Sequence, residues 1–169
     1  EFAYTMDLGK GELKMRAFAT HVSKLSIGVP GTLNFVSRKG EVGNNAGAAD
    51  SGAPDWRGIG NIGYEMDSGT NIGATLRFIG EAKVESDFAS NYLQGNDVPS
   101  RTYLDLNISQ EFNLSSGTLK VFAVVDNVFD RDPPVVVSLQ GTSPLDLPTN
   151  GALYDTIGRT IRIGTRIEF

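Results

Sequence analysis

Residues that could do chemistry are few in this chain. His21 is its single histidine and cysteine is absent, so no His-based metal cluster, catalytic triad, thiolate nucleophile or disulfide can be assembled from these 169 residues. The serines lie in no nucleophile-elbow context. The sequence therefore predicts no catalytic residue, and we expect His21 to be a wall residue or to lie near a loop.

Three carboxylates gather near one position in the sequence. Asp126, Asp130 and Asp132 offer the oxygen ligands that a hard cation such as calcium prefers. Such a group more often caps turns and pairs with a neighbouring cation, here Arg131. We therefore expect turn caps here and predict neither a metal nor a cofactor.

The glycines Gly58, Gly60 and Gly63 match the dinucleotide-binding fingerprint in spacing. That fingerprint needs a strand before it and a helix that begins at its third glycine. Here the glycines lie within a stretch of period-two alternation, and no helical pattern follows. We expect them to let strands bend and large neighbouring side chains pack closely.

Composition indicates an all-β chain with many turns. The 20 glycines and the clusters of Asn, Asp and Ser with Gly are typical of hairpin connections. The net charge of −5, with no basic run, argues against a nucleic-acid partner. No stretch approaches the roughly 18 apolar residues of a membrane helix, so any membrane crossing would be made by strands.

Alternation of apolar and polar residues predicts seven strands. Their expected ranges are 2–8, 12–25, 56–66, 71–84, 101–112, 118–128 and 160–169. Short turns at Gly9–Gly11, Asp67–Gly69 and Asn113–Gly117 alternate with three long connections, as in outer-membrane barrels. We expect an antiparallel meander of seven or eight strands from a transmembrane β-barrel. It is either an open part of a larger barrel or, with Thr32–Arg38 as an eighth strand, a small closed one.

The last strand divides most clearly into two faces. Ile161, Ile163, Ile167 and Phe169 point one way with Thr165, while charged residues alternate with them. Chain ends are usually frayed and polar, so an apolar final residue needs an apolar surrounding. A tilted transmembrane strand needs about 9–11 residues, which is the length available here.

Four segments together resemble the carboxy-terminal part of TonB-dependent outer-membrane receptors. They are Asp126–Pro134 (Asp-Asn-Val-Phe-Asp-Arg-Asp-Pro-Pro), Tyr154–Arg159 (Tyr-Asp-Thr-Ile-Gly-Arg), Pro54–Arg57 (Pro-Asp-Trp-Arg) and the alternating final strand. The resemblance implies that residues 1–169 form one domain, the closing part of a receptor barrel in the bacterial outer membrane. No part of the chain resembles a plug domain or a TonB-contacting box. We expect the chain to have been processed or cut from a longer one.

The resemblance also implies function and partners. The parent receptor would take up a scarce nutrient, such as a siderophore, cobalamin or a glycan, with energy relayed by the TonB system. Outer-membrane lipid, the plug domain and the barrel-assembly machinery would be its partners. That machinery would read Ile161, Ile163, Ile167 and Phe169. The ligand-binding residues stay unknown.

The orientation of the faces decides between the alternatives. With lipid outside, a charged inner wall is expected from Arg57, Arg77, Asp105, Asn107, Glu111, Lys120, Arg162, Arg166 and Glu168. Phe18 falls on this polar side and is expected to pack against other inner residues or a plug. Aromatic residues near strand ends favour lipid outside, namely Phe2, Tyr4, Trp56, Phe112 and Phe169. A soluble ligand-binding β-barrel or sandwich would bury the apolar face instead. A free-standing structural or adhesion barrel is the other alternative, and open edges would recruit further strands or copies.

Overall fold

The structure is a computed structural model of the chain. It describes residues 1–28, 31, 35–43, 52–85, 95–136 and 148–169. All of the regular structure in these ranges is β-structure, so the expected all-β class is confirmed.

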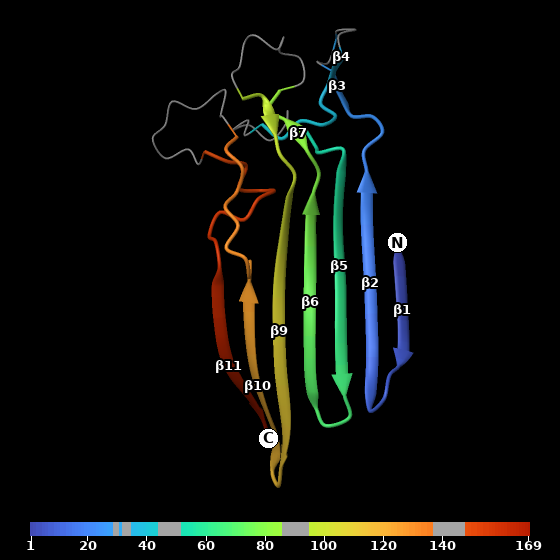
Figure 1. The fold of residues 1–169 in the computed structure, drawn as a ribbon, viewed down its shortest axis with the longest axis vertical. Coiled ribbons are helices and arrows are strands. Elements are labelled where there is room, and N and C mark those ends of the chain that lie inside the picture. Colours follow the sequence, from blue (N-terminus) through green and yellow to red (C-terminus); the bar gives the residue numbers. More distant parts are fainter. Residues whose placement is uncertain (29–30, 32–34, 44–51, 86–94, 137–147) are drawn as a thin grey trace.

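Seven strands form one antiparallel sheet in which sequence neighbours are also spatial neighbours (Figure 1). Their order is β1 (Phe2–Asp7), β2 (Gly11–His21), β5 (Trp56–Met66), β6 (Thr70–Ile79), β9 (Arg101–Leu114), β10 (Gly117–Asp126) and β11 (Thr160–Glu168). The sheet is an open meander with β1 and β11 as its edges. The prediction of a small closed barrel is therefore wrong for this structure.

The tight turns all lie at one end of the sheet, and the long connections lie at the other (Figure 1). Gly9 and Gly69 occupy two of these turns with φ of 63° and 82°. Side chains with a Cβ rarely adopt that left-handed region, so glycine suits both positions. The predicted alternation of short and long connections is thereby confirmed.

The segment expected as an eighth wall strand lies outside the main sheet. Its described part holds β4 (Phe35–Ser37), which pairs with β3 (Ser26–Gly28) in a separate two-stranded sheet. Residues 32–34 of the predicted Thr32–Arg38 strand fall outside the described ranges. Because β3 and β4 belong to the same connection and pair with each other at three positions, they form a hairpin that is separate from the wall.

Several predicted boundaries were too long. The strand expected over 12–25 ends at His21, and the one expected over 71–84 ends at Ile79. Residues beyond Ile79 leave the wall to form β7 (Ala82–Lys83), which pairs with β8 (Asp97–Val98). Strand β9 continues through Leu114, so most of the expected 113–117 turn is strand.

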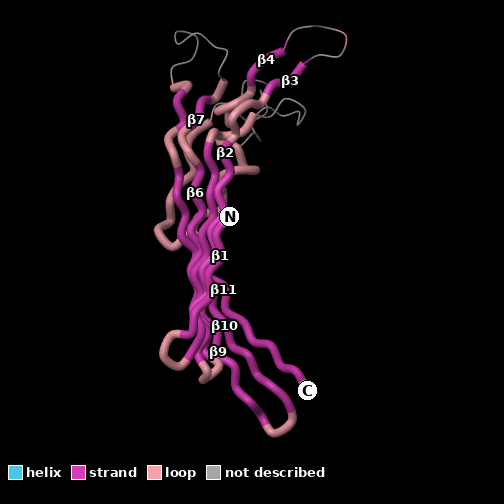
Figure 2. Tube along the Cα trace, turned by 90° about the vertical axis from the view of Figure 1, so that its right-hand side faces the viewer, coloured by secondary structure: helices cyan, strands magenta, loops and turns pink. Residues whose placement is uncertain are grey.

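The register gives the sheet two chemically different faces. Ile108 pairs with Ile72 on one side and with Ala123 on the other, and Ala123 pairs in turn with Ile163. The neighbouring Asn107 pairs with Gly73 and Val124. Directly paired residues point to the same side of a sheet, so the apolar rows of successive strands merge into one face. Seen edge-on, the strands form a single layer (Figure 2).

The buried core of the described residues lies near the long connections. It contains Val42, Ile79, Val84, Val98, Tyr103, Val136 and Tyr154. Most of these side chains come from connections or from the short strand β8, and only Ile79 and Tyr103 belong to wall strands. The core therefore ties the connections to the polar face of β6 and β9.

Candidate functional site

The apolar face is the largest chemically uniform surface of the sheet. Its exposed large side chains are Phe2, Tyr4, Trp56, Ile62, Ile72, Leu76, Phe78, Leu106, Ile108, Phe112, Leu114, Ile161, Ile163, Ile167 and Phe169. Ile108 is 48% exposed although β9 is an inner strand, and Ile163 on the edge is 77% exposed. Monomeric soluble proteins rarely expose a contiguous apolar surface of this extent.

The four residues of the predicted assembly signal share that face. Ile161, Ile163 and Ile167 pair with Val125, Ala123 and Leu119 of β10. Phe169 follows the last paired residue and is 98% exposed. The terminal apolar row is therefore accessible along its whole length.

The opposite face carries ion pairs between neighbouring strands. Lys14 Nζ lies 3.0 Å from Glu65 Oε2, and Arg162 Nη2 lies 2.7 Å from Asp126 Oδ2. The register places the whole predicted row of charged and polar wall residues, from Arg57 to Glu168, on this face. These side chains are mostly exposed, so each such pair stabilises the sheet by no more than about 1 kcal/mol.

The acidic trio forms turn contacts and ion pairs. Asp126 pairs with Arg162, while Asp130 Oδ1 accepts a hydrogen bond from the Arg159 backbone N at 2.8 Å. The Asp132 carbonyl oxygen accepts a bond from Arg101 Nε at 3.1 Å. The expected turn cap is present at Asp130. The expected pairing with Arg131 is replaced by Arg159, because the turn brings the start of β11 against Asp130.

Asn127 organises the turn that follows β10. Its side chain is fully buried, with Oδ1 accepting from the Arg131 backbone N at 2.9 Å and Nδ2 donating to the Arg131 carbonyl at 3.0 Å. Its φ of 49° is left-handed, a region that asparagine adopts more readily than most residues. The Asp-Asn-Val-Phe-Asp segment is therefore a turn that is held by hydrogen bonds from the Asn127 side chain.

A charge network joins this turn to the polar face. Arg77 Nε and Nη2 donate to the two Asp105 oxygens at 2.9 and 3.1 Å. Asp105 Oδ1 also accepts from the Asn127 backbone N at 2.9 Å. Asp155 lies 3.8 Å from Arg77 Nη2. One arginine thus connects β6, β9 and the segment before β11.

We call residues 148–159 the strap, because this segment crosses the polar face before β11 begins. Tyr154 packs in the core with Tyr103 and is only 3% exposed. Asn150 Nδ2 donates to the Val42 carbonyl at 3.2 Å. Burial raises the pKa of the Tyr154 hydroxyl to about 12, since the phenolate would lose its hydration.

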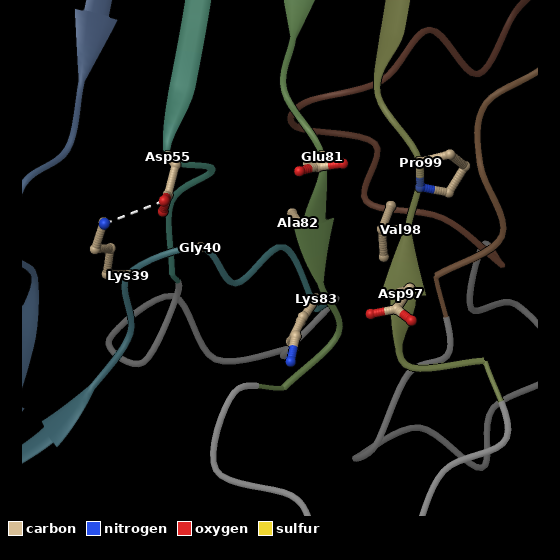
Figure 3. A pocket seen from close by; sticks show the side chains of 9 residues that line it. All are labelled: Lys39, Gly40, Asp55, Glu81, Ala82, Lys83, Asp97, Val98 and Pro99. Carbon is tan, nitrogen blue, oxygen red and sulfur yellow. Dashed lines mark ion pairs between the residues drawn. The ribbon is translucent and has the colours of Figure 1, made fainter. Parts of the chain in front are cut away.

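Two of the cavities lined by the described residues lie near the long connections. The larger, of about 660 Å³, is lined by Lys39, Gly40, Asp55, Glu81, Ala82, Lys83, Asp97, Val98 and Pro99 (Figure 3). Lys39 and Asp55, which both line it, form an ion pair at 3.1 Å (Figure 3). Its lining mixes both signs of charge and selects no single ligand class. The smaller cavity lies between the strap and the wall and is lined in part by Phe18 and Leu153.

The remaining predicted residues are placed as follows. His21 stacks on Trp56 with ring centroids 4.4 Å apart, at the end of β2 nearest the long connections. The three fingerprint glycines lie within β5. Phe2 begins β1, as expected of an aromatic residue near a strand end, while Phe2 and Tyr4 pair with Ala17 and Met15 in the body of β2.

The residues that hold the strap could not be recognised from the sequence. Tyr103 and Tyr154 are 51 positions apart by their numbering, and neither forms part of a recognisable pairing pattern. The signal available was that Tyr154 and Asp155 belong to a segment that resembles a receptor family. Its contacts with Tyr103 and Arg77 follow only from the fold.

Comparison of the chain with known protein families, curated proteins and solved structures found no match. Within the described ranges, no helix has the length and apolar character needed to cross a membrane. The same ranges contain no group of three or more His, Asp or Glu side chains arranged to hold a metal ion. The described residues therefore define a fold, an open seven-stranded antiparallel meander with one apolar and one polar face.

Proposed function

We propose that the chain is a wall segment of a TonB-dependent outer-membrane receptor, comprising its closing strands. The parent takes up a scarce nutrient, such as a siderophore, cobalamin or a glycan. The observation that carries the proposal is the exposed apolar face, which spans all seven strands while the buried core lies elsewhere. An apolar surface this wide needs a hydrophobic neighbour, and lipid supplies one over its full area.

Strand length and connection asymmetry support the proposal. Strands β2, β5, β6, β9, β10 and β11 have 11, 11, 10, 14, 10 and 9 residues. About 9–11 residues cross a bilayer when a strand is tilted. The tight turns then lie on the periplasmic side and the long connections outside the cell, as in outer-membrane barrels.

The proposed partners correspond to different parts of the surface. Lipid contacts the apolar face, and the plug domain and the TonB system act through the parent protein. The barrel-assembly machinery reads Ile161, Ile163, Ile167 and Phe169, an accessible apolar row at the end of β11. The edges β1 and β11 pair with further strands of the wall or with another copy, because open edges recruit partners.

Spin labelling along β9 tests the lipid-facing assignment. Because the chain lacks cysteine, single cysteines at each position from 104 to 111 carry one label each. In outer-membrane vesicles, labels at even-numbered positions are expected to collide with lipid-soluble oxygen. Labels at odd-numbered positions are expected to collide with a water-soluble nickel complex.

A period of two in these accessibilities, with the stated phase, supports the wall assignment. Even-numbered labels shielded from both reagents would indicate a dry protein interior instead. That result would move the chain to the class of soluble β-proteins.

A further inference from the structure

An apolar patch interrupts the polar face near the long connections. Phe18 of β2 and Ile59 of β5 are direct cross-strand partners on that face. They are 51% and 39% exposed. Their row neighbours Arg16 and Asn61 are polar, so the patch is a local exception to the alternation. Water contact with these two side chains costs free energy unless something covers them.

The strap converts this patch into a cleft. Leu153 lies opposite the wall, and the space between them has a volume of about 270 Å³. Its lining includes Phe18, Ile59, Ile79, Leu153, Arg57 and Arg77. Two contacts fix the strap at this height, namely Asp155 on Arg77 and Tyr154 in the core. The cleft therefore has an apolar floor, an apolar roof and a cationic side.

The two arginines of the cleft differ in their electrostatic state. Arg77 is held by Asp105 and Asp155, so its charge is already compensated. Arg57 is exposed and forms no ion pair within the described ranges, and no carboxylate lines the cleft there. An uncompensated guanidinium beside apolar side chains favours a ligand that brings an anion and an apolar body together.

We propose that this cleft binds a small aromatic carboxylate. Its ring lies against Phe18, Ile59 and Leu153, and its carboxylate accepts hydrogen bonds from Arg57. A fork-like guanidinium matches the two oxygens of a carboxylate, and ring–ring contact adds to the area buried. The volume of about 270 Å³ accommodates one or two fused rings. The inference rests on the proposed function, in which the polar face is the inner, accessible side of a receptor wall. It adds to that function the chemical class of a ligand.

Isothermal titration calorimetry on the detergent-solubilised protein tests the proposal with 2-naphthoate and its uncharged analogue 2-naphthamide. Naphthoate is expected to bind more tightly than naphthamide. Arg57→Gln weakens naphthoate binding about tenfold or more and leaves naphthamide unchanged, since a hydrogen bond to a charged group is lost. Arg57→Lys recovers part of the loss because it restores the charge. Phe18→Ala weakens both probes.

The matched control is Arg16→Gln. Arg16 lies on the polar face of β2, as Phe18 does, and its Nε lies 3.6 Å from a carboxylate oxygen of Glu1. The affinity of this variant for naphthoate stays that of the unaltered protein. Equal binding of the two probes, an unchanged affinity in Arg57→Gln, or no binding at millimolar naphthoate would each overturn the site. These outcomes are distinct from the spin-label result, which reports on the opposite face.

Discussion

The body of the sheet and its long-connection end are built on different principles. Along the body, inner strands such as β9 still expose large apolar residues, with Leu106 and Ile108 40% and 48% exposed. At the long-connection end, Val98, Tyr103 and Val136 are almost completely buried. The long-connection end therefore has a hydrophobic core of its own. The body is held by backbone ladders and by polar-face ion pairs.

This difference indicates where each region obtains its stability. Burial of apolar side chains stabilises the connection end whatever surrounds the molecule. The body leaves its large apolar side chains uncovered, so burial within the protein contributes little to its stability. Under the proposed function lipid covers these side chains, and changes to the two regions should respond differently to its removal.

The largest effect is expected from a charge placed on the apolar face of the body. Leu106→Arg should lower the free energy of unfolding in lipid vesicles by about 2–4 kcal/mol, because an arginine near the bilayer midplane loses its hydration. Urea unfolding in vesicles measures it. The adjacent Asn107→Arg, on the polar face, should change stability by no more than about 0.5 kcal/mol. Equal costs at the two positions would contradict the division into faces.

Alkaline pH should weaken the connection end through Tyr154. Its pKa of about 12 in the fold exceeds the ordinary value of 10.0, so the neutral hydroxyl stabilises the fold fully below pH 10. That contribution is lost as the pH rises from 10 through 12, and it amounts to roughly 3 kcal/mol. Tyr154→Phe should reduce the alkaline loss in thermal unfolding. Tyr4→Phe, which removes an exposed hydroxyl, should leave it in place.

The junction between the two regions should respond to Asp105. Asp105→Ala removes the acceptor for both Arg77 and the Asn127 backbone N, and should cost about 1–3 kcal/mol. Hydrogen exchange should rise in the strap and in the turn after β10. Exchange in β2, which has no bond to Asp105, should stay as it is. An unchanged strap would show that Tyr154 and the hydrogen bond from Asn150 to Val42 hold it without Asp105.

The smallest effect is expected from ion pairs on the exposed polar face. Arg162→Gln breaks the contact with Asp126 but should cost less than about 1 kcal/mol, because the arginine side chain is 66% exposed. Thermal unfolding at low and high salt measures the difference, which salt should reduce. A loss above about 2 kcal/mol would mean that this pair lies in a less watery environment than its exposure indicates.

The sequence predicted the body of the sheet well and the connection end poorly. Alternation placed all seven wall strands, since the period of two is a local property that each strand carries by itself. Val42, Val98 and Val136 lie in connections without any period, so nothing local predicts that they meet. The same limit applies to Thr32–Arg38, where brief alternation indicated a strand but not its partner.

The candidate surfaces divide in the same way. The apolar row of Ile161, Ile163 and Ile167 could be predicted because successive side chains of a strand point to opposite sides. The cleft beneath Leu153 could not be, since it depends on the strap lying over β2 and β5.

By itself, the sequence determined which residues share a face, because that depends only on the geometry of an extended chain and its short turns. The tertiary structure decided that β1 and β11 remain apart as edges, since closure depends on twist and register accumulated over the whole sheet. It also decided that Arg77 would pair with carboxylates and that Arg57 would form no ion pair with the described residues. Contacts between residues distant in the chain set those pairings, and no local pattern encodes them.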